Sequence, residues 1–119
     1  MEAGGAGDGT STLTGGNVGG LVGYLANGCC SISSCGVIMD INSTNGLVGG
    51  IIGVIKNIGE STVNLCFSIC DIHSDGNNVG GIIGDDRSDT YYKSKVLNCY
   101  YSGNICGKDD IGGIVGVYN

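Results

Sequence analysis

The sequence predicts an all-β fold, a parallel right-handed β-solenoid (β-helix) of about 3.5 repeats of 30–33 residues. The first observation is a six-residue glycine motif that occurs four times, with its first glycines 30, 31 and 32 residues apart. The second is a cysteine-containing segment that recurs in register with this motif. A fixed period of this size in a short chain indicates stacked supersecondary units. The copies of the glycine motif are Val18–Gly23, Val48–Gly53, Val79–Gly84 and Ile111–Gly116.

Composition is the third observation. With 119 residues the chain is one domain at most, so residues 1–119 are predicted to be a single repeat domain, with 1–17 a glycine-rich partial repeat or lead-in. The chain has 25 glycines, no proline and 41% hydrophobic residues, which fits neither a disordered nor a collagen-like chain. Glycine interleaved with Val, Ile and Leu suits tightly turning strands. Stacking equivalent strands gives parallel sheets, for which right-handed connections are the rule.

The glycine motif is the first element of each repeat, and it is predicted to be a strand. Its β-branched residues favour a strand, and its adjoining glycines disfavour a helix. The glycine pair also permits a bend or a close backbone approach. One coil of about 31 residues per repeat is preferred, with two shorter coils per repeat as the alternative.

A connector of variable length follows the glycine motif. It runs over Tyr24–Ser31, Val54–Thr62 and Asp85–Lys95, which are 8, 9 and 11 residues. Insertions in a solenoid collect on the face where a loop is free to bulge, so any specificity is expected there. The longest connector is the predicted contact loop, with candidate residues Asp85, Asp86, Arg87, Asp89, Tyr91, Tyr92, Lys93 and Lys95.

The next element is a cysteine-centred strand, which repeats as Ile32–Cys35, Val63–Cys66 and Val96–Cys99. Alignment predicts that its cysteines form one column in the core, because cysteine packs well as a small apolar residue. Zinc binding is less favoured, since the strong Cys-x-x-Cys spacing is missing. The seven cysteines cannot all pair, and disulfides stay open for Cys29, Cys30, Cys70 and Cys106. A short return of 12 or 13 residues then leads to the next glycine motif and is expected to form a corner.

The chain is predicted not to be an enzyme. His73 is its single histidine and is expected to be an exposed residue of the return, and no metallopeptidase His-Glu-x-x-His motif is present. The aspartates Asp85, Asp86, Asp89, Asp109 and Asp110 lack the rigid ladder of a calcium-binding solenoid, so solvated loops are expected instead. No cofactor and no metal is predicted.

The pattern Val-Gly-Gly-(Leu/Ile)-(Val/Ile)-Gly, followed by a polar connector and a strand such as Val96–Ile105, resembles the GLUG repeat. The resemblance covers about Val18 to Gly116. It departs from the family where Asp85 and Asp86 follow the third motif, and where Cys35 lacks a following aromatic residue. The resemblance implies large secreted or surface-exposed bacterial proteins, including adhesin-like proteins and some IgA-cleaving metallopeptidases, in which such repeats form a stalk. It implies no catalytic residues.

Charge and hydropathy limit the partners. A net charge of −6 argues against binding nucleic acid through a basic surface. No apolar run reaches the length of a membrane span, so membrane insertion is not expected. The N-terminus lacks the features of a signal peptide, so either the chain is cytoplasmic or its export signal lies upstream. The resemblance favours an extracellular or cell-surface location.

The favoured function is a structural or adhesive module that stacks end to end into fibres or against flanking repeats of a longer chain, and that contacts a host protein or a glycan. The chain opens inside a repeat and closes after a glycine motif, with no cap at either side. The alternative is an acidic inhibitor that mimics nucleic acid and binds a DNA-binding protein. A third reading is a polysaccharide-binding or polysaccharide-cleaving solenoid.

Overall fold

In the computed structural model, residues 10–13, 17–26, 30–44, 47–56, 60–87 and 94–118 are described. They form an all-β fold of parallel strands in four sheets, with no helix among them. None of the described segments is therefore a helix able to cross a membrane. The strands are β1 (Thr10–Leu13), β2 (Asn17–Gly19), β3 (Val22–Ala26), β4 (Cys30–Ser33), β5 (Gly36–Ser43), β6 (Leu47–Gly49), β7 (Ile52–Lys56), β8 (Ser61–Asn64), β9 (Phe67–Ser74), β10 (Val79–Gly80), β11 (Ile83–Asp86), β12 (Lys95–Leu97), β13 (Tyr100–Ser102), β14 (Ile105–Cys106), β15 (Ile111–Gly112) and β16 (Val115–Tyr118).

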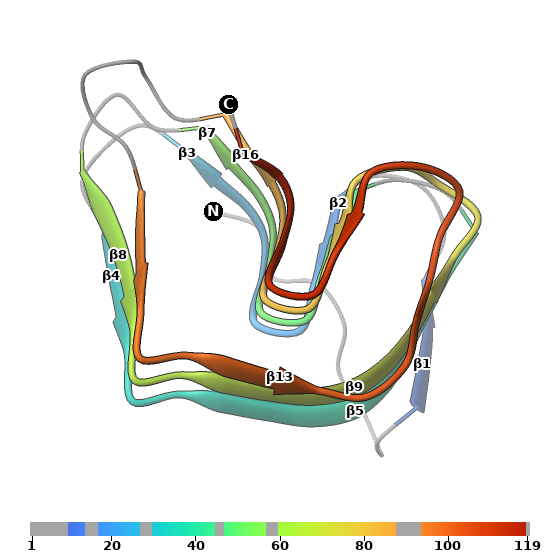
Figure 1. Ribbon diagram of the computed structural model, residues 1–119, viewed down its shortest axis with the longest axis horizontal. Helices are drawn as coiled ribbons and strands as arrows, with labels where there is room; N and C mark the ends of the chain where they lie inside the picture. The colour runs from blue at the N-terminus through green and yellow to red at the C-terminus, as the bar shows by residue number, and fades with distance from the viewer. Residues whose placement is uncertain are drawn as a thin grey trace.

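Each sheet collects equivalent strands of successive repeats. The first inner sheet contains β2, β6, β10 and β15, and the second inner sheet contains β3, β7, β11 and β16. The side sheet contains β4, β8 and β12, and the long sheet contains β1, β5, β9 and β13, with β14 also paired to β9. The chain passes through these sheets in this order and then begins again (Figure 1). We call one such passage a layer: β2–β5 is the first, β6–β9 the second, β10–β14 the third, and β15–β16 belong to a fourth.

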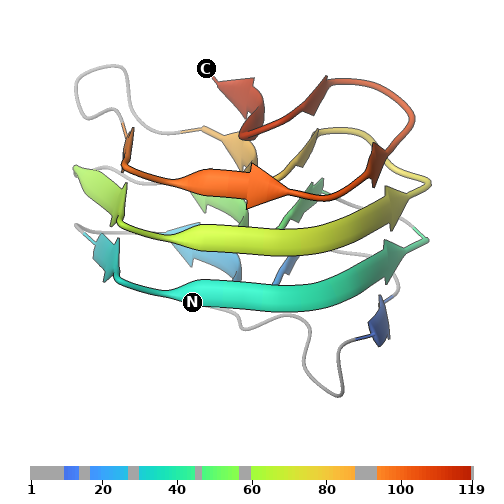
Figure 2. The same cartoon turned by 60° about the horizontal axis from the view of Figure 1, so that its bottom comes forward.

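The register of the strands follows the sequence period. Val18 pairs with Val48, Val48 with Val79, and Val79 with Ile111. All the parallel pairings join residues 30 to 33 positions apart, so one repeat supplies one layer. Figure 2 shows the result on the long sheet, where β5, β9 and β13 lie side by side. The molecule measures 34 × 26 × 22 Å.

The glycine motif is a tight turn between the two inner sheets. The chain reverses between β6 and β7 and points into the middle of the molecule (Figure 1). A Cβ on Gly49 would lie 1.9 Å from the carbonyl oxygen of Ile52, so no larger residue fits inside this turn. The expectation of a single glycine-rich strand is therefore wrong. The motif spans the end of one strand, a turn and the start of the next.

The cysteine-centred segment is a corner between the side sheet and the long sheet. Ser34, Leu65 and Asn98 occupy this corner in successive layers with φ of 55°, 55° and 51°. This left-handed conformation costs about 1–2 kcal/mol for a residue with a Cβ, so the corner must be held by contacts on both sides. The predicted continuous strand is thus divided by a bend immediately before each cysteine.

The core lies between the sheets and is built from stacked aliphatic columns. Ile51 and Ile82 are completely buried, whereas Leu21 and Ile114, which stand in the same column at its two ends, are less covered. Burial is deepest where a layer is covered on both sides. The largest fully buried side chains are Ile41, Ile51, Ile52, Ile55, Ile72, Ile82, Ile83, Val48, Val54, Val63 and Val79.

Candidate functional site

The predicted contact loop is divided by the structure. Asp85 and Asp86 belong to β11 and are 1% and 0% exposed, whereas Arg87 and Lys95 are exposed. The expectation that both aspartates lie in a solvated loop is therefore wrong, because the second inner sheet extends through them. The remaining candidates, Asp89, Tyr91, Tyr92 and Lys93, lie outside the described residues.

The Asp85 carboxylate holds the two inner sheets together beyond the glycine turn. Its Oδ2 accepts hydrogen bonds from Asn78 Nδ2 at 2.8 Å and from Arg87 Nε at 2.6 Å. Its Oδ1 is buried and has no hydrogen-bond partner within the described part of the chain. In the neighbouring layers Val54 and Val117 pair with this position, so one layer places a charged group where its neighbours place valine. Such a group depends on its donors, because water does not reach it.

Asp86 of the second inner sheet and Lys95 of the side sheet each contact a polar side chain of the same molecule. Asp86 Oδ1 accepts a hydrogen bond from Ser94 Oγ at 3.2 Å. Lys95 Nζ lies 2.8 Å from Glu60 Oε1 on the preceding layer, and both of these side chains are about half exposed. Exposed pairs of this kind contribute about 0–1 kcal/mol. The described part of the predicted loop therefore makes contacts within the molecule.

The cysteine column is placed at the corner of the side and long sheets. Cys66 is buried, and Cys35 and Cys99 are partly buried and pack against the same core. Each thiol also donates to the carbonyl oxygen two residues upstream, at 3.1 Å for Cys35, 3.3 Å for Cys66 and 3.1 Å for Cys99. The Asn64 and Leu97 oxygens also accept the backbone N–H groups of Ser34 and Leu65, so these thiols add a second hydrogen bond where the chain bends, a role that the sequence did not predict. All three are free thiols, as are Cys70 and Cys106, while Cys29 and the Cys30 side chain lie outside what is described.

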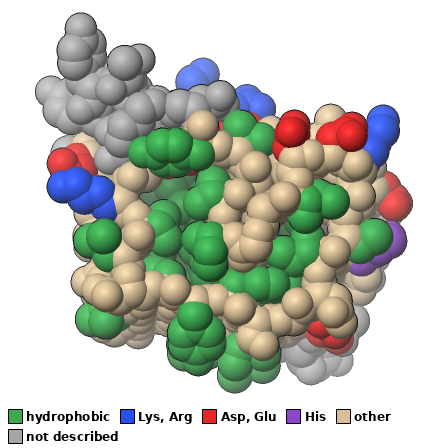
Figure 3. All heavy atoms as spheres, in the orientation of Figure 1, with side chains coloured by type: hydrophobic (Ala, Val, Ile, Leu, Met, Phe, Trp, Pro, Cys, Tyr) green, Lys and Arg blue, Asp and Glu red, His purple; other side chains and the backbone are tan. Residues whose placement is uncertain are grey.

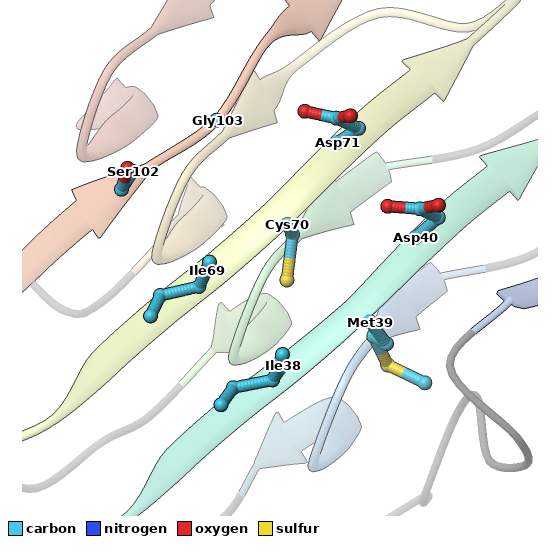
Figure 4. Close-up of a pocket in the computed structure, with 8 residues that line it drawn as sticks. All are labelled: Ile38, Met39, Asp40, Ile69, Cys70, Asp71, Ser102 and Gly103. Atoms are coloured by element: carbon cyan, nitrogen blue, oxygen red, sulfur yellow. The ribbon is translucent and has the colours of Figure 1, made fainter.

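The outer face of the long sheet carries two shallow hollows. The first, of about 270 Å³, is formed mainly by the outward columns Ile38–Ile69 and Asp40–Asp71 (Figure 4). The second, of about 280 Å³, continues from the aspartates to His73 and Cys106. His73 is exposed and belongs to β9, so this part of the return is a strand and not the expected corner. Its Nε2 lies 3.4 Å from Asp75 Oδ1.

Aromatic residues line the same outer face beside the first hollow. The rings of Phe67 and Tyr100 stack with centroids 5.5 Å apart and an interplanar angle of 12°. Tyr101 points the other way, and its hydroxyl donates to the Cys70 carbonyl oxygen at 2.6 Å. Burial raises the pKa of Tyr101 to about 12 and also raises the pKa of the Cys70 thiol, which lies 3.0 Å from Ser68 Oγ.

The last layer exposes apolar core to solvent. Viewed onto this layer, hydrophobic side chains lie inside the outline of the backbone (Figure 3). Ile111 is 48% exposed and Ile114 is 37% exposed, although their counterparts Val79 and Ile82 one layer below are completely buried. The sequence marks these residues as strand residues but does not show which copy of a repeat lies at a surface.

Within the described ranges, no group of three or more His, Cys, Asp and Glu side chains is arranged to hold a metal ion. Comparisons of the chain with family models, with curated proteins and with solved structures found no match.

Proposed function

We propose that the chain is a structural β-solenoid module of a secreted or surface-exposed bacterial protein, with one right-handed coil per repeat. The observation that carries this proposal is the register: strand pairing joins residues one repeat apart in all four sheets. A molecule built this way gains length by adding layers, and each layer contacts only its neighbours. That is the property of a stalk or fibre, and the resemblance to GLUG repeats supports the same reading.

An in-register deletion tests the proposal. Removal of residues 47–77 joins positions that are equivalent in successive layers, because Leu47 and Asn78 occupy the same position in their repeats. We expect a folded protein with a cooperative unfolding transition, shorter along the stack by about 4.8 Å. Circular dichroism, denaturant unfolding and small-angle scattering measure this.

The matched control is a deletion of residues 47–62, which removes about half a repeat and places strands in the wrong sheets. This control is expected not to fold. If the in-register deletion is equally unfolded, the chain folds as one indivisible unit and the proposed modular scaffold is wrong.

The outer face of the long sheet is the part we assign to adhesive contact with a host protein or a glycan. Its support is the stacked pair Phe67 and Tyr100 beside the exposed Ile38 and Ile69. Aromatic rings next to polar groups favour sugar and protein contacts alike. A glycan array probed with the native chain and with Tyr100→Ala measures this: binding that is lost in the variant supports the assignment, and binding unchanged in the variant refutes it.

No contact among the described residues favours the alternative of an acidic inhibitor that mimics nucleic acid. Burial of Asp85 and Asp86 removes two of the eleven acidic side chains from the surface that a nucleic-acid mimic needs.

A further inference from the structure

We propose that two copies of this chain associate head to tail, so that the last layer of one copy, its tail face, receives the first layer of the next, its head face. The proposal rests on the proposed function, because it assumes that layers add along one axis. It goes further by naming the partner, the polarity of the contact and the residues that specify it.

The glycine turns carry a directional hydrogen-bond pattern. The carbonyl oxygen of Ile51 accepts from the N–H groups of Leu21 and Val22, both at 3.0 Å. The same pattern repeats in the next two layers: the Ile82 oxygen accepts from residues 51 and 52, and the Ile114 oxygen from residues 82 and 83, at 2.9–3.0 Å. At each turn two donors thus point toward the following layer, and one carbonyl receives them.

The two ends of this column are complementary. Ile114 and Val115 occupy the donor positions of the last layer, and no described residue lies beyond them to accept. Leu21 occupies the acceptor position of the first layer, and no described residue donates to its carbonyl. Placing Leu21 of a second copy over Ile114 supplies the missing acceptor in the geometry already used three times within the chain. The same contact covers the exposed side chains of Ile111 and Ile114.

The outlines of the two ends also match. At the tail, β15 and β16 of the fourth layer extend the inner sheets. The long sheet ends in the third layer, where β13 and β14 pair with β9. At the head, β1 extends the long sheet, pairing with Asp40–Ser43 of β5. With β2 and β3 of a second copy on β15 and β16, its β1 falls on the column of β14, because residues 41, 72 and 105 are equivalent. The extra strand β1 at the head of one copy therefore occupies part of the position that the long sheet leaves empty at the tail of the other.

Symmetric contacts do not reproduce this arrangement. Two tail faces brought together present donors to donors, and their protruding inner strands coincide. A head-to-tail contact leaves a free head and a free tail, so it propagates into a filament instead of closing into a dimer. Among the described strands, the edges of β12 and β13 stay unpaired in such a filament.

Gly113 offers a selective way to block the tail face. A Cβ on Gly50 would lie 2.1 Å from the Gly81 oxygen, and one on Gly81 would lie 2.2 Å from the Gly113 oxygen. A Cβ on Gly113 meets nothing within 4 Å. Gly113→Ala is therefore harmless within one chain, but it places a methyl group where the Gly20 carbonyl of the next copy has to lie.

The test mixes two variants with opposite faces blocked. Gly113→Ala blocks the tail and Leu21→Lys blocks the head, while each variant keeps its other face. In sedimentation velocity we expect concentration-dependent growth of the native chain, loss of that growth in each variant alone, and a one-to-one complex in the mixture that grows no further. Ile38→Lys on the exposed outer face of the long sheet is the matched control and should associate like the native chain.

Circular dichroism and the Tm of each variant establish that it is folded. The proposal is overturned if the native chain stays monomeric at every concentration, if either blocked variant dimerises alone, or if the mixture forms no complex. Equal loss of association in Ile38→Lys also overturns it, since that result indicates unspecific apolar adhesion. The in-register deletion tests the modular scaffold separately. If that deletion variant folds but the chains do not associate, the head-to-tail contact is refuted and the proposed scaffold stands.

Discussion

Single residues show where the layers differ, and Asp85 is such a residue. It is a buried carboxylate between Val54 and Val117, held by Asn78 and by the half-exposed Arg87. Removing one partner of a buried ion pair leaves an uncompensated charge, whereas replacing the charge by an apolar group of similar size is often neutral or stabilising. Substitution of Arg87 and substitution of Asp85 are therefore expected to change the free energy of unfolding by different amounts, unlike the two substitutions of an exposed ion pair.

We therefore expect Arg87→Ala to lower the free energy of unfolding by about 1–2 kcal/mol, a value discounted for the exposure of the guanidinium. Asp85→Val, which copies the adjacent layers, is expected to be neutral or stabilising. Urea unfolding of both variants measures the difference. Equal losses in the two variants would show that the carboxylate contributes net stability and that this interpretation is wrong.

Tyr101 and Cys70 predict how stability depends on pH. Burial raises the pKa of both groups above the ordinary values of 10.0 and 9.0, with Tyr101 at about 12. The unfolded chain therefore ionises first, so stability is complete below pH 9.0 and is lost as the pH rises toward about 12. Urea midpoints measured from about pH 8 to about pH 11 should fall.

Tyr101→Phe is the control for this alkaline loss. It removes the hydroxyl bond to Cys70, which costs about 1 kcal/mol at neutral pH, and it should also make the decline at high pH shallower. An unchanged decline in the variant would assign the alkaline loss to other groups.

At the scale of elements, the glycine turn is the part of each repeat with the least tolerance. A Cβ on Gly50 would meet the Gly81 oxygen and Ser68 Oγ, both at 2.1 Å. The Gly81 oxygen cannot move without shifting the Ile82 N–H of the same peptide group, which donates to the Ile114 oxygen. We expect Gly50→Ala to cost about 2–4 kcal/mol. Gly113→Ala, at the equivalent place in the last layer, should stay within about 0.5 kcal/mol.

Thermal or urea unfolding of the two alanine variants, in dilute solution where association is absent, compares the same substitution in two surroundings. If Gly50→Ala lowers the free energy of unfolding more than Gly113→Ala does, the contact with the following layer is the cause of the loss. Similar costs in both variants would point to backbone conformation within the turn instead.

The cysteine corner is an element that the sequence located but did not explain. Its position follows from the repeat, yet the residues with positive φ are Ser34, Leu65 and Asn98, which share no chemical property. The left-handed bend is set by the sheets that meet there, and the thiol of the next residue donates to the carbonyl that precedes the bend. A local propensity therefore could not have predicted it.

At the scale of the whole molecule, stability is expected to be graded along the stack. The second layer is covered on both sides and contains the fully buried Ile51 and Ile52, whereas Ile111 and Ile114 of the last layer are exposed. Nearest-neighbour stacking predicts that the terminal layer opens more readily than the middle. We expect amide hydrogen exchange to be slowest for residues 48–55 and fastest for 111–118 in dilute solution.

Mass spectrometry of peptides measures the rate of amide hydrogen exchange in each part of the chain. Raising the protein concentration should add protection to residues 111–118 and to the facing first layer, and less to the middle layers, if copies stack head to tail. Uniform protection along the chain would instead indicate that the layers unfold as one unit.

The sequence by itself determined the period, the stacking partners and the need for glycine. Parallel pairing places each residue beside its equivalent one repeat away, so alignment of Val18, Val48, Val79 and Ile111 already specifies a column. Only the tertiary structure decided where the chain turns, and with that which side chains face inward. The glycine motif became a turn instead of a strand, and Asp85 and Asp86 became buried instead of solvated. The physical reason is that repetition along the chain fixes neighbours along the stack, whereas the path within a layer depends on contacts between sheets that no single repeat contains.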